Sequence, residues 1–171
     1  MAARARSVAP GWRSVFTDLG SRLRADLPSD LRDGSWRFSG IMAKLSYGNA
    51  LIHYEIWVRP RQRVVELGLH FEADALTNAR LLAAFRARSS EVRRSLGRDA
   101  RVEEWDRGWA RVWEPLSLEL PSAELRSRVA DRFVDYVRAL EPIVRDELPN
   151  DVEWRLPTRR KRKAISSRAS R

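Results

Sequence analysis

Residues 36–71 read WRFSGIMAKLSYGNALIHYEIWVRPRQRVVELGLHF, and apolar side chains recur at every second position in three successive runs. The runs are residues 36–45, 50–58 and 63–71. A period of two is that of a β-strand with one buried face, so each run is predicted to be a strand. Turn-forming residues separate the runs at 46–49 and 59–62. The segment therefore predicts three consecutive antiparallel strands.

The two turns also predict which residues lie opposite each other. The first turn pairs Leu45 with Ala50, and the second pairs Ile56 with Val65. Directly opposed residues share a face of the sheet, so both pairings place the apolar residues of all three strands on the same side. This agreement between two independent turns is the strongest sequence evidence for the fold.

Helical periodicity flanks these strands. Apolar residues at helical spacing predict three helices. The second begins at the N-cap Asp74 and ends at Gly97, and Pro142 is expected to weaken the last one near its end. The first helix covers residues 14–27, the last begins at Pro121, and a hairpin of residues 100–105 and 109–114 precedes it. We expect an α+β fold of order α-βββ-α-ββ-α, with a mainly antiparallel sheet of about five strands and helices on one face.

The charge of the chain is concentrated at its ends. The 171 residues carry a net charge of +10, but residues 1–13 hold three arginines and no acid, and residues 155–171 hold eight basic residues and no acid. Residues 14–154 have a net charge of −1. We therefore expect a basic N-terminal arm over 1–13, a single α+β domain over 14–149, and a basic disordered tail over 150–171.

Composition excludes several classes of protein. The chain has no cysteine, which rules out disulfides, thiolate catalysis and cysteine-based zinc sites. No apolar run approaches the roughly 18 residues of a membrane span, and neither a dinucleotide-binding glycine motif nor a phosphate-binding P-loop is present. We expect a cytoplasmic protein without a cofactor, a catalytic residue or a membrane partner.

The sheet face opposite the apolar residues carries all of the histidine in the chain. The alternation places four chemically reactive side chains on it: His53, Glu55, Glu66 and His70. The predicted register puts Glu55 directly opposite Glu66, an arrangement that a bound cation or a nearby arginine would have to compensate. Two imidazoles and two carboxylates form a reasonable metal or acid–base set. The alternative is a solvated face whose glutamates are neutralised by Arg37 or Arg59.

The second hairpin is rich in tryptophan. Closing it over residues 106–108 pairs Trp105 with Trp109, and Arg111 falls on the same aromatic and charged face. The candidate interaction face consists of Trp57, Trp105, Trp109, Arg111 and Trp113. Such a face can stack on bases of single-stranded nucleic acid or form a protein interface, including one with a second copy of the chain. The alternative is that these rings pack under the helices as core.

The tail contains five consecutive basic residues: Arg159, Arg160, Lys161, Arg162 and Lys163. Each can neutralise a phosphate and release counterions, which predicts a sequence-independent contact with nucleic acid. A tail that only solvates the chain, a membrane-surface contact and a localisation signal are the alternatives.

Three features between Tyr47 and Leu148 resemble a bacterial and phage family, domain of unknown function 4268. They are the strand pair IHYEIWVRP and RVVELGLHF, the helix end FRARSSEVRRSLG, and the element VEEWDRGWARVWEP before a long helix. The resemblance covers about 60% of the chain. It implies an accessory domain of the kind attached to restriction or defence proteins, although this chain departs from the usual pattern because its 171 residues include no nuclease-like domain.

Together these patterns favour a non-catalytic accessory or binding domain that contacts nucleic acid through its tail. A small metal-dependent enzyme or metal-binding module on the open sheet face is the first alternative. A protein–protein interaction domain that does not bind nucleic acid is the second.

Overall fold

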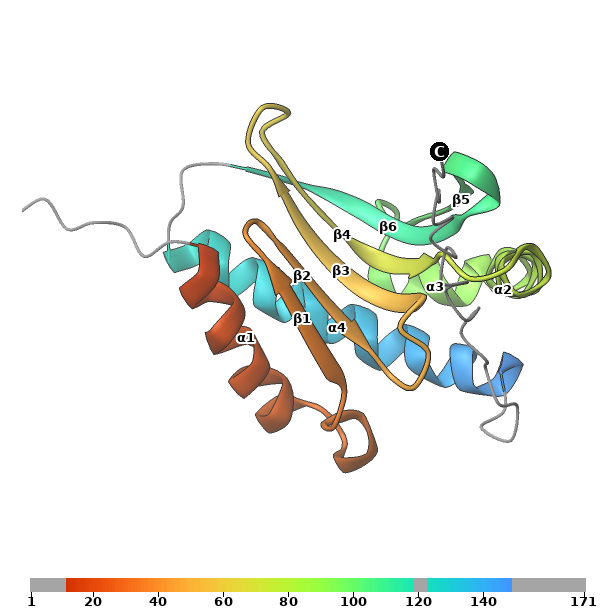
Figure 1. Cartoon of the computed structure of the whole chain (residues 1–171), viewed down its shortest axis with the longest axis horizontal. Helices are drawn as coiled ribbons and strands as arrows, with labels where there is room; N and C mark the ends of the chain where they lie inside the picture. The colour runs from red at the N-terminus through yellow and green to blue at the C-terminus, as the bar shows by residue number, and fades with distance from the viewer. Residues whose placement is uncertain (1–11, 119–122, 149–171) are drawn as a thin grey trace, which may run out of the picture.

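The predicted antiparallel sheet is present and has six strands. The computed structural model describes residues 12–118 and 123–148 (Figure 1). The elements, in chain order, are α1 (Trp12–Asp26), η1 (Ser29–Leu31), β1 (Ser35–Ser39), β2 (Met42–Ser46), β3 (Ile52–Arg59), β4 (Val64–Phe71), α2 (Ala75–Ala87), α3 (Ser89–Leu96), β5 (Arg101–Glu104), η2 (Asp106–Gly108), β6 (Ala110–Ser117) and α4 (Ala123–Glu147). The strands lie in the order β1-β2-β3-β4-β6-β5, and every neighbouring pair is antiparallel.

The predicted strand over residues 36–45 is instead a hairpin, which corrects the strand count from five to six. β1 and β2 are separated by Gly40 and Ile41, and Gly40 has a φ of +57°. This left-handed conformation is open to glycine at no steric cost, so the chain can reverse there. Trp36 lies opposite Leu45 and Phe38 opposite Ala43, so the apolar residues of both strands face the helices. The apolar positions change from even numbers (36 and 38) to odd numbers (43 and 45) across Gly40, which is the sequence signal that one continuous strand does not explain.

The predicted registers were wrong by an even number of residues. Leu45 lies opposite Tyr54 rather than Ala50, and Ile56 lies opposite Leu67 rather than Val65. The loop between β2 and β3 covers residues 47–51 and is longer than a tight turn. Within it the Asn49 side chain accepts a hydrogen bond from the backbone N–H of Leu51, at 2.9 Å. An even shift keeps each side chain on its face, so the predicted apolar side of the sheet is still the core side.

The single long helix predicted between the two strand groups is two helices. α2 begins at Asp74, whose carboxylate accepts hydrogen bonds from the backbone N–H groups of Leu76 and Thr77, as the N-cap prediction required. The chain leaves helical geometry at Arg88, and α3 then continues to the predicted C-cap, Gly97. The observed order is therefore α-ββββ-αα-ββ-α.

The hydrophobic core lies between the sheet and the helices. Figure 1 shows α4 passing behind the sheet with α1 beside it, and α2 and α3 near the β5–β6 end. Phe133 of α4 packs edge-on against Tyr54, with 6.1 Å between ring centroids, and lies parallel to Trp36 at 5.8 Å. Side chains buried this completely contribute roughly 1.5–3 kcal/mol each. The largest are Phe16, Tyr54, Phe71, Phe85, Phe133 and Tyr136.

The edges of the sheet are β1 and β5, and α4 is the longest helix. Pro142 lies inside α4, which nevertheless continues to Glu147.

Among the described residues no helix combines the length and the hydropathy that crossing a bilayer requires. Of the predicted basic arm over 1–13, residues 1–11 lie outside the described residues and the last two begin α1. The predicted basic tail over 150–171 lies outside the described residues.

Candidate functional site

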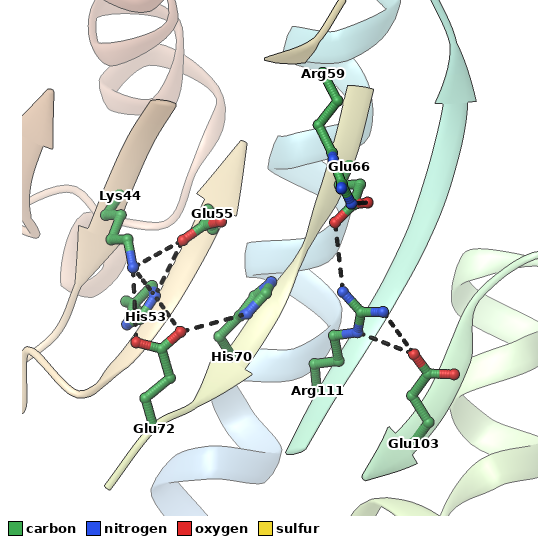
Figure 2. A network of polar contacts seen from close by, with 9 residues as sticks. All are labelled: Lys44, His53, Glu55, Arg59, Glu66, His70, Glu72, Glu103 and Arg111. Atoms are coloured by element: carbon green, nitrogen blue, oxygen red, sulfur yellow. Dashed lines mark hydrogen bonds and ion pairs between the residues drawn. The ribbon is translucent and has the colours of Figure 1, made fainter. Parts of the chain in front are cut away.

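The face of the sheet that points away from the helices carries several polar side chains that are nearly inaccessible to water. Alternate positions of β2, β3, β4 and β6 supply them, opposite to the core residues of the same strands. His53 is 2% exposed and His70 is 3% exposed, and their rings stack with 5.7 Å between centroids. Glu55 and Glu66 are also buried. Buried polar groups of this kind need partners, and Figure 2 shows two groups of them.

The first group, which we call the histidine–glutamate cluster, consists of His53, Glu55, His70 and Glu72. Each residue offers one nitrogen or oxygen atom, and these atoms lie within 4.8 Å of one another. The ammonium group of Lys44 points into the cluster from β2, with Nζ 2.8 Å from Glu55 Oε2 and 2.9 Å from His53 Nε2 (Figure 2). It is also 3.7 Å from Glu72 Oε2. The cluster therefore surrounds a positive charge supplied by the chain itself.

Electrostatics fixes the charge state of two members of the cluster. Burial alone would raise the pKa of Glu55, but hydrogen bonds with His53 and Lys44 outweigh it and lower that pKa to about 2. Burial lowers the pKa of His70 to about 3. At neutral pH Glu55 is therefore an anion and His70 a neutral imidazole, the two forms in which these residues bind cations.

The second group is a chain of alternating arginines and glutamates: Arg59, Glu66, Arg111 and Glu103. Arg59 donates to one carboxylate oxygen of Glu66, and Arg111 Nη1 lies 3.4 Å from the other. Arg111 also donates to Glu103 through Nε at 3.0 Å and Nη2 at 2.7 Å. The predicted opposition of Glu55 and Glu66 is wrong, because Glu66 lies opposite Trp57 and Glu55 opposite Gly68. Glu66 is neutralised by Arg59, as the solvated-face alternative proposed, and belongs to this group.

The tryptophan hairpin has the predicted register, with Glu103 opposite Arg111 and Arg101 opposite Trp113. Its aromatic rings are half-buried and already hold guanidinium groups of the chain. The Arg111 guanidinium lies 3.8 Å from the ring centroid of Trp113 and 4.7 Å from that of Trp105. A base could stack there only by displacing Arg111.

The remaining predicted interaction residues surround this pair. Trp57 lies under the guanidinium of Arg59, at 4.7 Å, and Trp109 is tilted against Trp105 with 5.9 Å between centroids. Contact of this face with a protein partner or a second copy stays a prediction. The tail residues 159–163 lie outside the described residues.

One member of the histidine–glutamate cluster, Glu72, escaped prediction, and so did its lysine partner, Lys44. Glu72 follows His70 by two positions, so continuing the alternation one step past the end of the strand would have placed it on the polar face. Lys44 was on that face by alternation, but the wrong register placed it away from Glu55, which is its actual partner opposite.

A second polar centre lies on the core side of the sheet, beneath the end of α4. Tyr54 donates to Glu141 at 3.0 Å, and Arg145 Nε donates to the other carboxylate oxygen at 3.2 Å. Glu141 and Arg145 border a hollow of about 490 Å³ that Asp30 and Tyr47 also line. Burial raises the pKa of Glu141. Both oxygens of Glu141 have partners, so the arrangement is complete without a ligand.

The fold and the face together define an α+β domain with one helix-covered side and one side lined by buried charged and aromatic residues. Comparisons with protein families, with curated proteins and with solved structures found no match for this chain. The resemblance to domain of unknown function 4268 stays a prediction.

Proposed function

We propose that the protein is a non-catalytic binding domain that contacts the phosphate backbone of nucleic acid without sequence preference. The basic residues 159–163 supply one contact. A pair of arginines on the folded domain, Arg86 and Arg93, supplies the second. The observation that supports this proposal is that these two arginines, both without an ion-pair partner among the described residues, line the same hollow.

Many arginines of the domain are held by carboxylates. Arg22, Arg88, Arg132 and Arg145 each form an ion pair with an aspartate or glutamate of another element. Arg86 and Arg93, in contrast, are exposed and form no ion pair with any described residue. They line one hollow of about 180 Å³ together with Ser89 and Ala100. Two unpaired guanidinium groups beside a hydroxyl suit a phosphate, which guanidinium binds through paired hydrogen bonds.

The test is fluorescence anisotropy with a labelled 20-nucleotide DNA, single-stranded and duplex, between 50 and 200 mM salt. We expect weak binding by the full chain, with a Kd of about 10⁻⁴–10⁻⁶ M at physiological salt and a linear fall of log K with log salt. Replacing residues 159–163 with glutamine should lower the magnitude of that slope by up to about 4.5 on duplex DNA, and Arg86→Gln with Arg93→Gln should lower it by about 2.

The matched control removes two other exposed arginines, Arg24 of α1 and Arg37 of β1, neither of which has an ion-pair partner among residues 12–118 and 123–148. This variant loses the same charge and should keep the slope of the full chain. Binding that is insensitive to salt, or equal in all variants, would contradict the proposal.

A further inference from the structure

The proposed function makes no use of the histidine–glutamate cluster, although that cluster is the most completely buried polar group on the open face. His53, Glu55 and His70 are buried, and Glu72 is half-buried at the end of β4. The chain has no cysteine and only two histidines, and both histidines lie here. All of the imidazole nitrogens that this chain could offer to a ligand therefore lie in this cluster.

His70 has ligand capacity that the protein does not use. Its Nδ1 atom is buried and has no hydrogen-bond partner. This atom faces into the cluster, 3.8 Å from Glu72 Oε1, which is too long for a hydrogen bond (Figure 2). A buried polar atom left unpaired destabilises the fold unless something else binds it. His53 presents Nε2 to the same space, 3.4 Å from Glu55 Oε2.

Lys44 shows that the space accepts a cation. Its ammonium lies within hydrogen-bond distance of His53 and Glu55 and close to Glu72. The Lys44 side chain is 28% exposed, so it has a route to solvent on a flexible stem. An ammonium donates hydrogen bonds but leaves the Nδ1 of His70 without a partner, whereas a metal ion would bind all four side chains.

We propose that the histidine–glutamate cluster is a binding site for a divalent transition metal of the zinc type, and that Lys44 is the internal cation which the metal displaces. Two imidazole nitrogens and two carboxylates favour zinc and its neighbours over calcium or magnesium, which prefer oxygen ligands alone. Bonds of about 2.0–2.2 Å require the four side chains to close in slightly. Glu72, beyond the end of the strand, has the most freedom to do so.

The competing explanation is that Lys44 and the two glutamates form a closed ion-pair network with no ligand. The two explanations differ for Lys44→Met. Without a metal site this variant leaves Glu55 as a buried anion, and no divalent ion restores the lost stability. With a metal site the competing charge is gone, so zinc binds about tenfold or more tightly than in the wild type and raises the melting temperature.

The experiment uses the full chain without an affinity tag and Zn²⁺ alone as the probe, with isothermal titration calorimetry and thermal unfolding at pH 7.5. We expect one site in the wild type, tighter binding in Lys44→Met, and binding weakened at least about tenfold in His70→Gln. Glu66→Gln is the matched control, because it removes a glutamate from the same face outside the cluster and should bind zinc as the wild type does.

The wild type also gives a readout that needs no variant. Its two histidine ring signals in the NMR spectrum should shift together on adding one equivalent of zinc. Lys44→Gln replaces Lys44→Met if the latter does not fold. Two outcomes overturn the proposal: no zinc-dependent heat, ring shift or melting change in the wild type and the Lys44 variant, or zinc binding that His70→Gln retains in full.

Discussion

At the scale of single residues, the core contains one ion pair whose two members depend on each other. Glu114 of β6 points toward the helices and is 2% exposed, and Arg132 of α4 donates to both of its carboxylate oxygens. Arg132 also donates to the backbone carbonyl of Leu96 at the end of α3. This one guanidinium therefore links the sheet to two helices.

Removing the arginine alone should be costly. We expect Arg132→Met to lower the free energy of unfolding by about 3–5 kcal/mol, because it leaves a buried carboxylate without a counter-charge. The measurement is urea unfolding followed by tryptophan fluorescence. The double variant Arg132→Met with Glu114→Leu should recover most of the loss, since an apolar pair of similar size suits the same place. A cost below about 1 kcal/mol for the single variant would contradict this account.

Single residues also limited what the sequence could predict. Glu114 follows the apolar Val112 on the core side of β6, and nothing local in the sequence identifies a partner 18 positions away on α4. His53, Glu55 and His70 were found because alternation depends only on neighbouring positions. Which of them approach each other depends on the register of β3 and β4, which the turn at residues 60–63 sets. In this turn Arg63 has a φ of +55°.

At the scale of elements, the pairing of β4 with β6 requires a glycine. Gly68 lies opposite Trp113, and a Cβ atom added to Gly68 would lie 2.5 Å from the carbonyl oxygen of Val112 and 2.6 Å from Trp113 Cβ. Backbone atoms cannot move aside without separating the strands.

We therefore expect Gly68→Ala to destabilise the protein by at least about 2 kcal/mol. Gly20→Ala is the matched control, and we expect it to change stability in the opposite direction. Gly20 lies inside α1, and the nearest atom to its added Cβ is 3.9 Å away. Alanine there should stabilise the helix by about 0.5–1 kcal/mol. Thermal and urea unfolding measure both changes. A Gly68→Ala variant as stable as the wild type would show that β4 and β6 are not paired this closely.

Element type was more predictable than element number. Alternation and helical spacing correctly indicated strands and helices, together with the capping of α2 by Asp74 and the end of α3 at Gly97. The break at Arg88 was missed because it does not interrupt the apolar stripe of the predicted helix. The reversal at Gly40 was missed although the apolar positions shift there from even to odd numbers.

At the scale of the whole molecule, the buried polar face should make stability depend on pH. The folded protein holds the pKa of His70 near 3 and that of Glu55 near 2, both below their ordinary values of 6.5 and 4.5. The unfolded chain therefore binds more protons between pH 6.5 and 2, and stability falls as the pH falls through that range. Burial of Glu141 raises its pKa and acts in the opposite direction.

We expect the free energy of unfolding to decrease by up to about 1.4 kcal/mol for each pH unit and each group titrating, starting below pH 6.5. Urea unfolding at pH 7, 6, 5 and 4 with a chelator present measures it. The His70→Gln variant should lose the dependence between pH 6.5 and 4.5 and keep the part due to carboxylates at lower pH. A wild-type stability that is flat from pH 7 to 4 would contradict the buried neutral state of His70.

The two edges of the sheet are unequal, and this has a consequence for handling the protein at high concentration. β5 has four residues and carries Arg101, Glu103 and Glu104, whereas β1 presents Phe38 at 52% exposure and ends beside the exposed Ile41. Short charged edges resist the addition of a foreign strand, and apolar ones attract it. Intermolecular sheet extension, and with it aggregation during storage, should therefore begin at β1, where a lysine in place of Phe38 would suppress it.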